Sequence, residues 1–238
     1  MFTFSRLGDV AYWGRLGNQL WEIASTVGIA RRNHQDYVFP EWKYNNYFRT
    51  GIPTSNNVYN FPLYRYEGFE YKEIDLEGDV DLLGYFQSYK YFDHCKDEIL
   101  RLFRPRMSVN FPLTQTAIHI RRGDYLDRSS FHTVLSMEYY KKAMTYFPNS
   151  EFTIFSDDIQ WCKKNFDIER CYFVEPSEDI LDFFYMASFE NQIISNSSYS
   201  YWAAYLNTNY NKKIIAPKDW CSFPINNWEL CPPEWTRI

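Results

Sequence analysis

The second half of the chain alternates between short apolar runs and segments with apolar residues at helical spacing. The apolar runs have the length and the β-branched or aromatic content of buried strands. They cover residues 116–120, 152–155, 171–174, 192–195 and 213–215. The helical segments between them cover residues 136–147, 157–166 and 178–189. This alternation predicts an α/β fold with a parallel, doubly wound sheet.

The first half is less regular. Apolar residues from Leu20 to Ala30 form one helical stripe after a glycine turn at residues 14–17. The remaining expectations are strands at residues 37–39 and 81–86, a loop at 41–66, and a helix at 92–103 that Pro105 ends. The N-terminal half is therefore also expected to mix strands and helices.

A length of 238 residues suits either one large α/β domain or two small ones. Two prolines and a polar stretch interrupt the pattern at residues 104–113. We therefore expect an N-terminal domain at 1–110 and a C-terminal domain at 111–238. The last residues of the chain could pack back on the N-terminal domain.

Charge and cysteine content limit the partners. With 25 basic and 30 acidic residues the net charge is -5, which gives no support for nucleic-acid binding, so any phosphate site must be local. The five cysteines are odd in number and form no CxxC pair, which favours a reduced, cytoplasmic protein. Residues 1–14 lack the apolar run of a signal peptide, and no stretch approaches the ~18 apolar residues of a membrane span. We expect no integral membrane segment, although peripheral membrane contact stays open.

Basic and acidic side chains follow the expected strand at residues 116–120. His119 lies in this strand, and Arg121, Arg122 and Asp124 come directly after it. Ligands of open parallel sheets bind at the carboxyl ends of the strands, and the arginine fork grips phosphate oxygens in pairs, so the sequence favours a diphosphate site with Asp124 orienting one arginine. A surface ion-pair cluster is the alternative.

Two further polar clusters follow neighbouring strands. Asp157 follows the strand at 152–155, and Asn196, Ser197 and Ser198 follow the strand at 192–195. Hydroxyl and backbone N–H groups at a helix start bind anions, and a carboxylate can accept from a ribose or a guanine. Asp157, Ser197 and Ser198 could each instead simply cap a helix. Together with the arginine pair, however, the clusters favour a nucleotide diphosphate site.

Four segments of the chain resemble the α-1,2-fucosyltransferase family (glycosyltransferase family 11 type). They are Gly14-Arg-Leu-Gly-Asn-Gln19, Gly84-Tyr-Phe-Gln-Ser88, His119-Ile-Arg-Arg-Gly-Asp-Tyr125 and Asn196-Ser-Ser-Tyr-Ser-Tyr-Trp202. The resemblance implies a GT-B architecture with two Rossmann-like halves. It also implies inverting transfer of fucose from GDP-fucose to the 2-hydroxyl of a galactose-terminated acceptor, with no metal or other cofactor.

The resemblance also implies roles for individual residues. Arg121 is expected to bind the β-phosphate of GDP-fucose, His119 to contact the nucleotide, and Ser197 or Ser198 to hold phosphate oxygens. Asn18 matches a position next to the reacting sugar. Asp124 and Glu175 are carboxylates to examine as the base, because the acceptor hydroxyl must lose a proton.

Other functions stay open. A fucosyltransferase of another linkage, such as α-1,6, is the first alternative. A nucleotide-diphosphate hydrolase would also use arginines and hydroxyls, but the histidines show no metal-ligand spacing. A carbohydrate-binding module would use the many aromatic side chains, but it has no need for the arginine pair. Asp79 and Asp81 resemble a DxD metal site, but their position before an expected strand favours a solvated turn.

Overall fold

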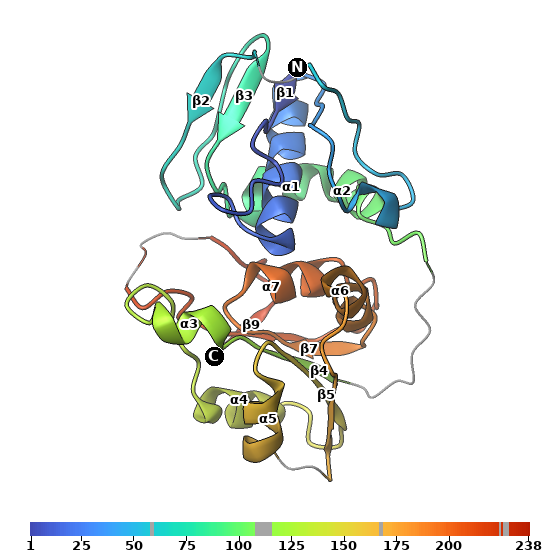
Figure 1. The fold of residues 1–238 in the computed structure, drawn as a ribbon, viewed down its shortest axis with the longest axis vertical. Coiled ribbons are helices and arrows are strands. Elements are labelled where there is room, and N and C mark those ends of the chain that lie inside the picture. Colours follow the sequence, from blue (N-terminus) through green and yellow to red (C-terminus); the bar gives the residue numbers. More distant parts are fainter. Residues whose placement is uncertain (58–59, 108–115, 167–168, 224, 226–228) are drawn as a thin grey trace. The chain divides into compact units, whose positions relative to one another are not determined.

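The computed structural model describes residues 1–57, 60–107, 116–166, 169–223, 225 and 229–238. The chain divides into two compact units (Figure 1). Unit 1 comprises Met1–Ser108 and Ile225–Pro232, and unit 2 comprises Val109–Pro224 and Pro233–Ile238. The expected domain boundary between residues 110 and 111 lies outside the described residues.

Unit 1 contains a small parallel sheet. Among the described residues its strands are β1 (Phe2–Thr3), β2 (Leu63–Arg65) and β3 (Val80–Leu83), in the order β1-β3-β2. Tyr37 forms a single parallel bridge to Phe2, where a strand was expected at 37–39. Strand β2 lies in the segment expected to be a loop. Leu63 is exposed, so this edge strand has no buried apolar run to indicate it.

Helix α1 (Leu16–Arg32) is the central element of unit 1 (Figure 1). All of its residues from Leu16 to Ala30 are buried except Asn18, so the helix is enclosed rather than half exposed as an apolar stripe suggests. Gly28 permits this enclosure, because a Cβ there would lie 2.1 Å from the carbonyl oxygen of Tyr91. Helix α2 (Lys96–Leu102) is shorter than expected, since 3-10 turns at Tyr89–Tyr91 and Asp93–Cys95 precede it.

Unit 2 is built on a parallel sheet with the order β6-β5-β4-β7-β8-β9 in the described part of the chain. The strands are β4 (Thr116–Ile120), β5 (Phe152–Ser156), β6 (Cys171–Phe173), β7 (Asn191–Ile193), β8 (Ile214–Ala216) and β9 (Thr236–Arg237). Ile118 pairs with Ile154 on one side and with Ile193 on the other. The apolar runs of the sequence therefore predict β4 to β8, whereas β9 was not expected.

Helices cover both faces of this sheet (Figure 1). They are α4 (Met137–Met144), α5 (Ile159–Asn165), α6 (Asp179–Ala187) and α7 (Ser198–Tyr205), and a short α3 (Gly123–Asp127) follows β4. Ile118 and Ile154 share a buried cluster with Tyr140 of α4 and Cys162 of α5. The chain runs from β4 outward to β6 and then returns to β7 on the other side of β4. The predicted doubly wound α/β fold is confirmed, and its topological switch point lies between β4 and β7.

Candidate active site

Arg121 lies at the carboxyl end of β4 between two carboxylates. Its Nη2 donates to Oδ1 of Asp124 at 2.5 Å, and its Nη1 lies 3.0 Å from Oδ2 of Asp157. The side chain is 18% exposed, and its guanidinium carbon is 5.3 Å from the centroid of the Tyr125 ring. A guanidinium carries five N–H donors, so two ion pairs fix its plane and leave donors for a ligand. The structure thus brings together three side chains from the sequence prediction.

Arg122 is held in a separate set of contacts. Its backbone N–H donates to Oδ1 of Asp157 at 2.9 Å, and its Nε donates to Oδ2 of Asp158 at 3.2 Å. The guanidinium stacks 3.9 Å above the centroid of the Trp161 ring. Arg122 therefore anchors the end of β4 to the start of α5, and its side chain engages different partners from that of Arg121.

The two neighbouring aspartates have different roles. Asp158, not Asp157, is the N-cap of α5, and its Oδ1 accepts from the backbone N–H of Trp161 at 3.2 Å. The alternative that Asp157 is the helix cap is therefore wrong. Its carboxylate instead binds Arg121 and the backbone of Arg122, and a residue with a Cβ at Gly123 would collide with it.

His119 is buried beneath this edge of the sheet. Its Nδ1 lies 2.7 Å from Oγ of Ser195, and its ring contacts the ring of Tyr199 at 5.5 Å between centroids. Burial, and then the charge of Arg121, lowers the pKa of His119 to about 3. The imidazole is therefore neutral near pH 7, so it can offer one N–H and one acceptor but no charge.

Asn196 fastens the β7–α7 junction to two distant loops. Its Nδ2 donates to the carbonyl oxygens of Thr133 at 2.9 Å and Trp220 at 2.8 Å. The backbone carbonyl oxygen of Asn196 accepts from the hydroxyl of Tyr125 at 3.0 Å. Both amide hydrogens are thus engaged with backbone, and the expected contact of this side chain with a nucleotide stays a prediction.

Ser197 and Ser198 begin α7, close to the switch point. Ser197 occupies the N-cap position, but among the described residues its side chain makes no capping hydrogen bond. Its carbonyl oxygen accepts from the backbone N–H of Tyr201 at 2.9 Å. Ser198 is half-buried in the first turn. Helix starts with serine hydroxyls suit phosphate oxygens, and this role stays a prediction for both residues.

Asn18 belongs to unit 1 and lies in the first turn of α1. The N-cap is Arg15, so the alternative role of Asn18 as a helix cap is wrong. Its Nδ2 donates to the carbonyl oxygen of Trp13 at 3.2 Å, and its Oδ1 accepts from Nε2 of Gln87 at 3.3 Å. The second contact joins the two N-terminal segments that carry the family resemblance. Its expected place near the reacting sugar stays a prediction.

The carboxylates considered as a DxD metal site or as the base form hydrogen bonds or ion pairs with neighbouring residues. Asp79 binds the N-terminal ammonium at 2.9 Å, and Asp81 accepts from the hydroxyl of Ser5 at 2.6 Å. Asp81 is buried in β3, so the interpretation as a solvated turn is wrong for this residue. Glu175, considered as a base, is exposed and paired with Lys163. Among the described residues no group of His, Cys, Asp or Glu has the arrangement of a metal site.

Tyr125 is part of this site, although the sequence pattern did not assign it a role. Its ring lies beside the guanidinium of Arg121 and stacks on the His132 ring at 4.0 Å, and its hydroxyl reaches the backbone of Asn196. Burial raises the pKa of Tyr125 to about 12, so the hydroxyl stays a donor. The position of Tyr125 at the end of the segment at residues 119–125 is the feature of the sequence that could have indicated a role in the site.

The chain has two α/β units, each built on a parallel sheet, and the second unit carries a basic and polar site at its switch point. These features define a GT-B type protein. The chain belongs to glycosyl transferase family 11, whose family model matches residues 10–238. The expected membership is therefore confirmed, and the protein is a transferase of a fucosyltransferase family.

Relatives with established names support this membership. An alpha-1,2-colitosyltransferase of Escherichia coli is 33% identical and covers 73% of this chain and 69% of its own. The O-antigen biosynthesis glycosyltransferase WbnK of Escherichia coli is 30% identical, over 81% and 74%. Galactoside alpha-(1,2)-fucosyltransferase 2 of Hylobates lar is 27% identical, over 94% and 77%.

The fold also matches a solved structure. The crystal structure of NodZ alpha-1,6-fucosyltransferase soaked with GDP-fucose superposes with a TM-score of 0.51 at 14% identity. The match covers 86% of this chain and 92% of that chain. At this identity the likeness supports the GT-B type fold. In addition, no helix of the described residues is long and apolar enough to cross a membrane.

Proposed function

We propose that the protein transfers L-fucose from GDP-β-L-fucose to the 2-hydroxyl of a terminal galactose, with inversion at the anomeric carbon. The observation that carries the proposal is the guanidinium of Arg121, fixed by Asp124 and Asp157 at the carboxyl end of β4. Relatives named as α-1,2-fucosyltransferases support the linkage, and the NodZ structure soaked with GDP-fucose supports the donor.

The chemistry requires stabilisation of a leaving diphosphate. The acceptor oxygen forms a bond to the anomeric carbon from one face while the bond to the β-phosphate oxygen breaks on the other. The electron pair of the broken bond goes to GDP, and the acceptor proton goes to a base. Because charge grows on the diphosphate, a pre-oriented guanidinium acts most strongly in the transition state. Arg121 is the residue proposed for this task, and Asp124 and Asp157 orient it.

The neutral side chains have complementary tasks in this proposal. His119 carries no charge and is bonded to Ser195, so it suits a hydrogen bond to the nucleotide rather than proton transfer at pH 7. Ser197 and Ser198 bind phosphate oxygens at the start of α7. Arginine and hydroxyl donors can neutralise the diphosphate, and we propose that no metal is needed.

Transfer of a colitosyl group is a second candidate, because a relative at 33% identity is named an alpha-1,2-colitosyltransferase. The test is to incubate the purified protein with GDP-fucose or GDP-colitose and a panel of galactose-terminated acceptors, with and without EDTA. We expect an α-1,2-fucosyl product, identified by NMR, whose yield is unchanged by EDTA. A different linkage, transfer of colitose alone, or hydrolysis without transfer would contradict the proposal. Loss of turnover in EDTA that Mn²⁺ restores would contradict its metal-free part.

We also propose a cytoplasmic location, supported by the odd number of cysteines without a CxxC pair. Cell fractionation with thiol labelling tests it. A protein recovered outside the cytoplasm with oxidised cysteines would contradict this location.

A further inference from the structure

Two distant segments of unit 1 pair as a short antiparallel ribbon. Phe48 forms an antiparallel bridge with Pro105. The backbone N–H of Arg49 donates to the carbonyl oxygen of Arg104 at 2.9 Å, and that of Arg106 donates to Tyr47 at 2.8 Å. Arg49 and Arg104 are therefore direct cross-strand neighbours.

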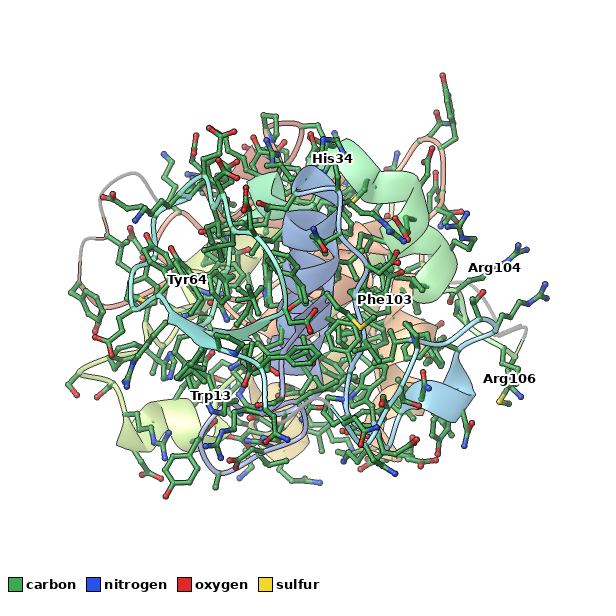
Figure 2. All side chains as sticks on the ribbon, turned by 90° about the horizontal axis from the view of Figure 1, so that it is seen from above. Trp13, His34, Tyr64, Phe103, Arg104 and Arg106 are labelled. Atoms are coloured by element: carbon green, nitrogen blue, oxygen red, sulfur yellow. The ribbon has the colours of Figure 1, made fainter. Side chains whose placement is uncertain are left out.

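The pairing places three arginines on one side of the ribbon. Side chains of a strand alternate between two faces. Phe48 is fully buried and faces the core of unit 1. Arg49 follows Phe48, and Arg104 and Arg106 flank its partner Pro105, so the three arginines lie on the opposite face of the ribbon and are exposed. We call these three residues the arginine face. Figure 2 shows Arg104 and Arg106 on the same side of unit 1.

The charges of the arginine face are not neutralised locally. None of its guanidinium groups forms an ion pair within 4.0 Å of an acidic group in the described ranges, although Arg106 donates to the carbonyl oxygen of Phe48 at 3.4 Å. Glu98, on the nearby helix α2, is already bound by Arg31 and Tyr37. Like charges opposite each other in a ribbon destabilise it, so this arrangement does not serve the stability of unit 1.

We propose that the arginine face binds the headgroups of an anionic phospholipid bilayer. Each guanidinium carries a fixed positive charge, and three such charges on an exposed ribbon suit the broad array of phosphates of an anionic bilayer. Met107, which is 58% exposed, follows directly and can enter the interfacial region. The whole chain has a net charge of -5, so attraction to an anionic bilayer has to come from a local cluster of positive charge such as this face.

The expected strength follows from the number of arginines. Each one near an anionic bilayer strengthens partitioning roughly fivefold, so the face contributes about a hundredfold. Such binding is weak and reversible. It also falls steeply at about 0.5 M salt, where the screening length is a few ångströms.

The test is co-sedimentation of the full chain with phosphatidylcholine vesicles, with and without phosphatidylglycerol, at low and high salt. We expect binding to the anionic vesicles at low salt and none to neutral vesicles. The variant Arg49→Gln/Arg104→Gln/Arg106→Gln should lose about a hundredfold in partitioning. The matched control Lys141→Gln/Lys142→Gln/Lys164→Gln removes the same charge from exposed positions of unit 2 and should retain binding.

A second variant shows whether a loss of binding is due to misfolding, and whether the ligand is attracted by charge alone. Replacing the same three arginines by lysine keeps the charge but removes the planar fork. Vesicle binding should persist within about threefold if a bilayer field is the partner. Four outcomes would overturn the proposal. The wild type could fail to bind vesicles, or it could bind only a free anionic oligosaccharide. The folded lysine variant could lose binding, or the glutamine variant and its control could lose binding equally. None of these outcomes depends on transferase activity.

Discussion

Gly123 lies against the carboxylate of Asp157, so that a Cβ on this glycine would stand 2.5 Å from Oδ2. The same carboxylate binds Nη1 of Arg121 at 3.0 Å and the backbone N–H of Arg122 at 2.9 Å. A single carboxylate thus fixes the direction of the segment after β4. The absence of a side chain at Gly123 allows it to come close enough.

Gly123→Ala is expected to displace Asp157 and with it the guanidinium of Arg121. Since misplacement by about 1 Å can cost up to 10²-fold in rate, we expect a loss of this order in kcat/KM for the donor. A double-mutant cycle with Asp157→Ala is the control. If Gly123→Ala is equally harmful without the carboxylate, the contact between the two residues is not the cause.

Arg121→Lys is expected to lower kcat by about 10²- to 10³-fold although the charge is kept, because an ammonium cannot reproduce the oriented fork. Steady-state kinetics with the donor varied would measure this. Arg128→Lys, at an exposed position just after α3, is the matched control and should behave as the wild type. Near-normal kcat and donor KM in Arg121→Lys would make Arg121 a structural ion-pair residue.

The buried imidazole of His119 makes stability depend on pH. Its pKa of about 3 in the folded protein lies below the value near 6.5 of an unfolded chain. The unfolded state therefore binds more protons between these values, and stability that is present above pH 6.5 is lost as the pH falls, by at most about 1.4 kcal/mol per pH unit. Urea unfolding of wild type and His119→Gln from pH 7 to 4.5 should show a shallower loss in the variant. Parallel curves would contradict this assignment.

Glu22 should destabilise the protein at neutral pH. It is buried in α1, both carboxylate oxygens lack a hydrogen-bond partner among the described residues, and burial, followed by the charge of Asp9, raises its pKa well above the usual value. Its protonated form is favoured by folding, so stability falls as the pH rises from about 4.5 toward the folded pKa. Glu22→Gln should raise Tm at pH 8 and should flatten this slope. Glu70→Gln, at an exposed position, is the control, and no gain over it would show that Glu22 has an unseen partner.

Asn18→Ser removes the contacts with Trp13 and Gln87, so we expect a loss of about 1 kcal/mol in stability. If Asn18 also acts beside the reacting sugar, kcat should fall far more than this loss explains. Gln87→Ala breaks the same side-chain pair from the other end and serves as the comparison. Equal, small changes of kcat in both variants would remove Asn18 from the mechanism.

The sequence predicts unit 2 better than unit 1 for a physical reason. Strands buried on both faces, such as β4 and β5, are continuous apolar runs, and the helices between them are amphipathic. Strand β2 is an exposed edge, and β9 has only two residues, so neither carries such a pattern. Their pairing is set by tertiary contacts.

The candidate site shows the same limit. The position of Arg121 at a sheet edge follows from local sequence, because a charged segment after a buried strand must lie there. The separate tasks of Asp157 and Asp158 depend on the approach of Gly123, which sequence spacing does not reveal. The attachment of Asn196 to Thr133 and Trp220 joins residues far apart in the chain. No local pattern could have indicated it.

The path of the chain has a practical consequence for dissecting the protein. After completing most of unit 2 the chain enters unit 1 at Ile225, leaves it at Pro232, and ends in β9 of unit 2. Within unit 1 the carbonyl oxygen of Glu229 accepts from the hydroxyl of Ser88 at 2.7 Å, and its carboxylate pairs with Lys90 at 2.6 Å. A fragment cut between the halves would separate Glu229 from both partners. Neither unit is a contiguous piece of sequence. A protein designed to contain unit 1 alone therefore has to include Ile225–Pro232, and one that contains unit 2 alone has to include Pro233–Ile238.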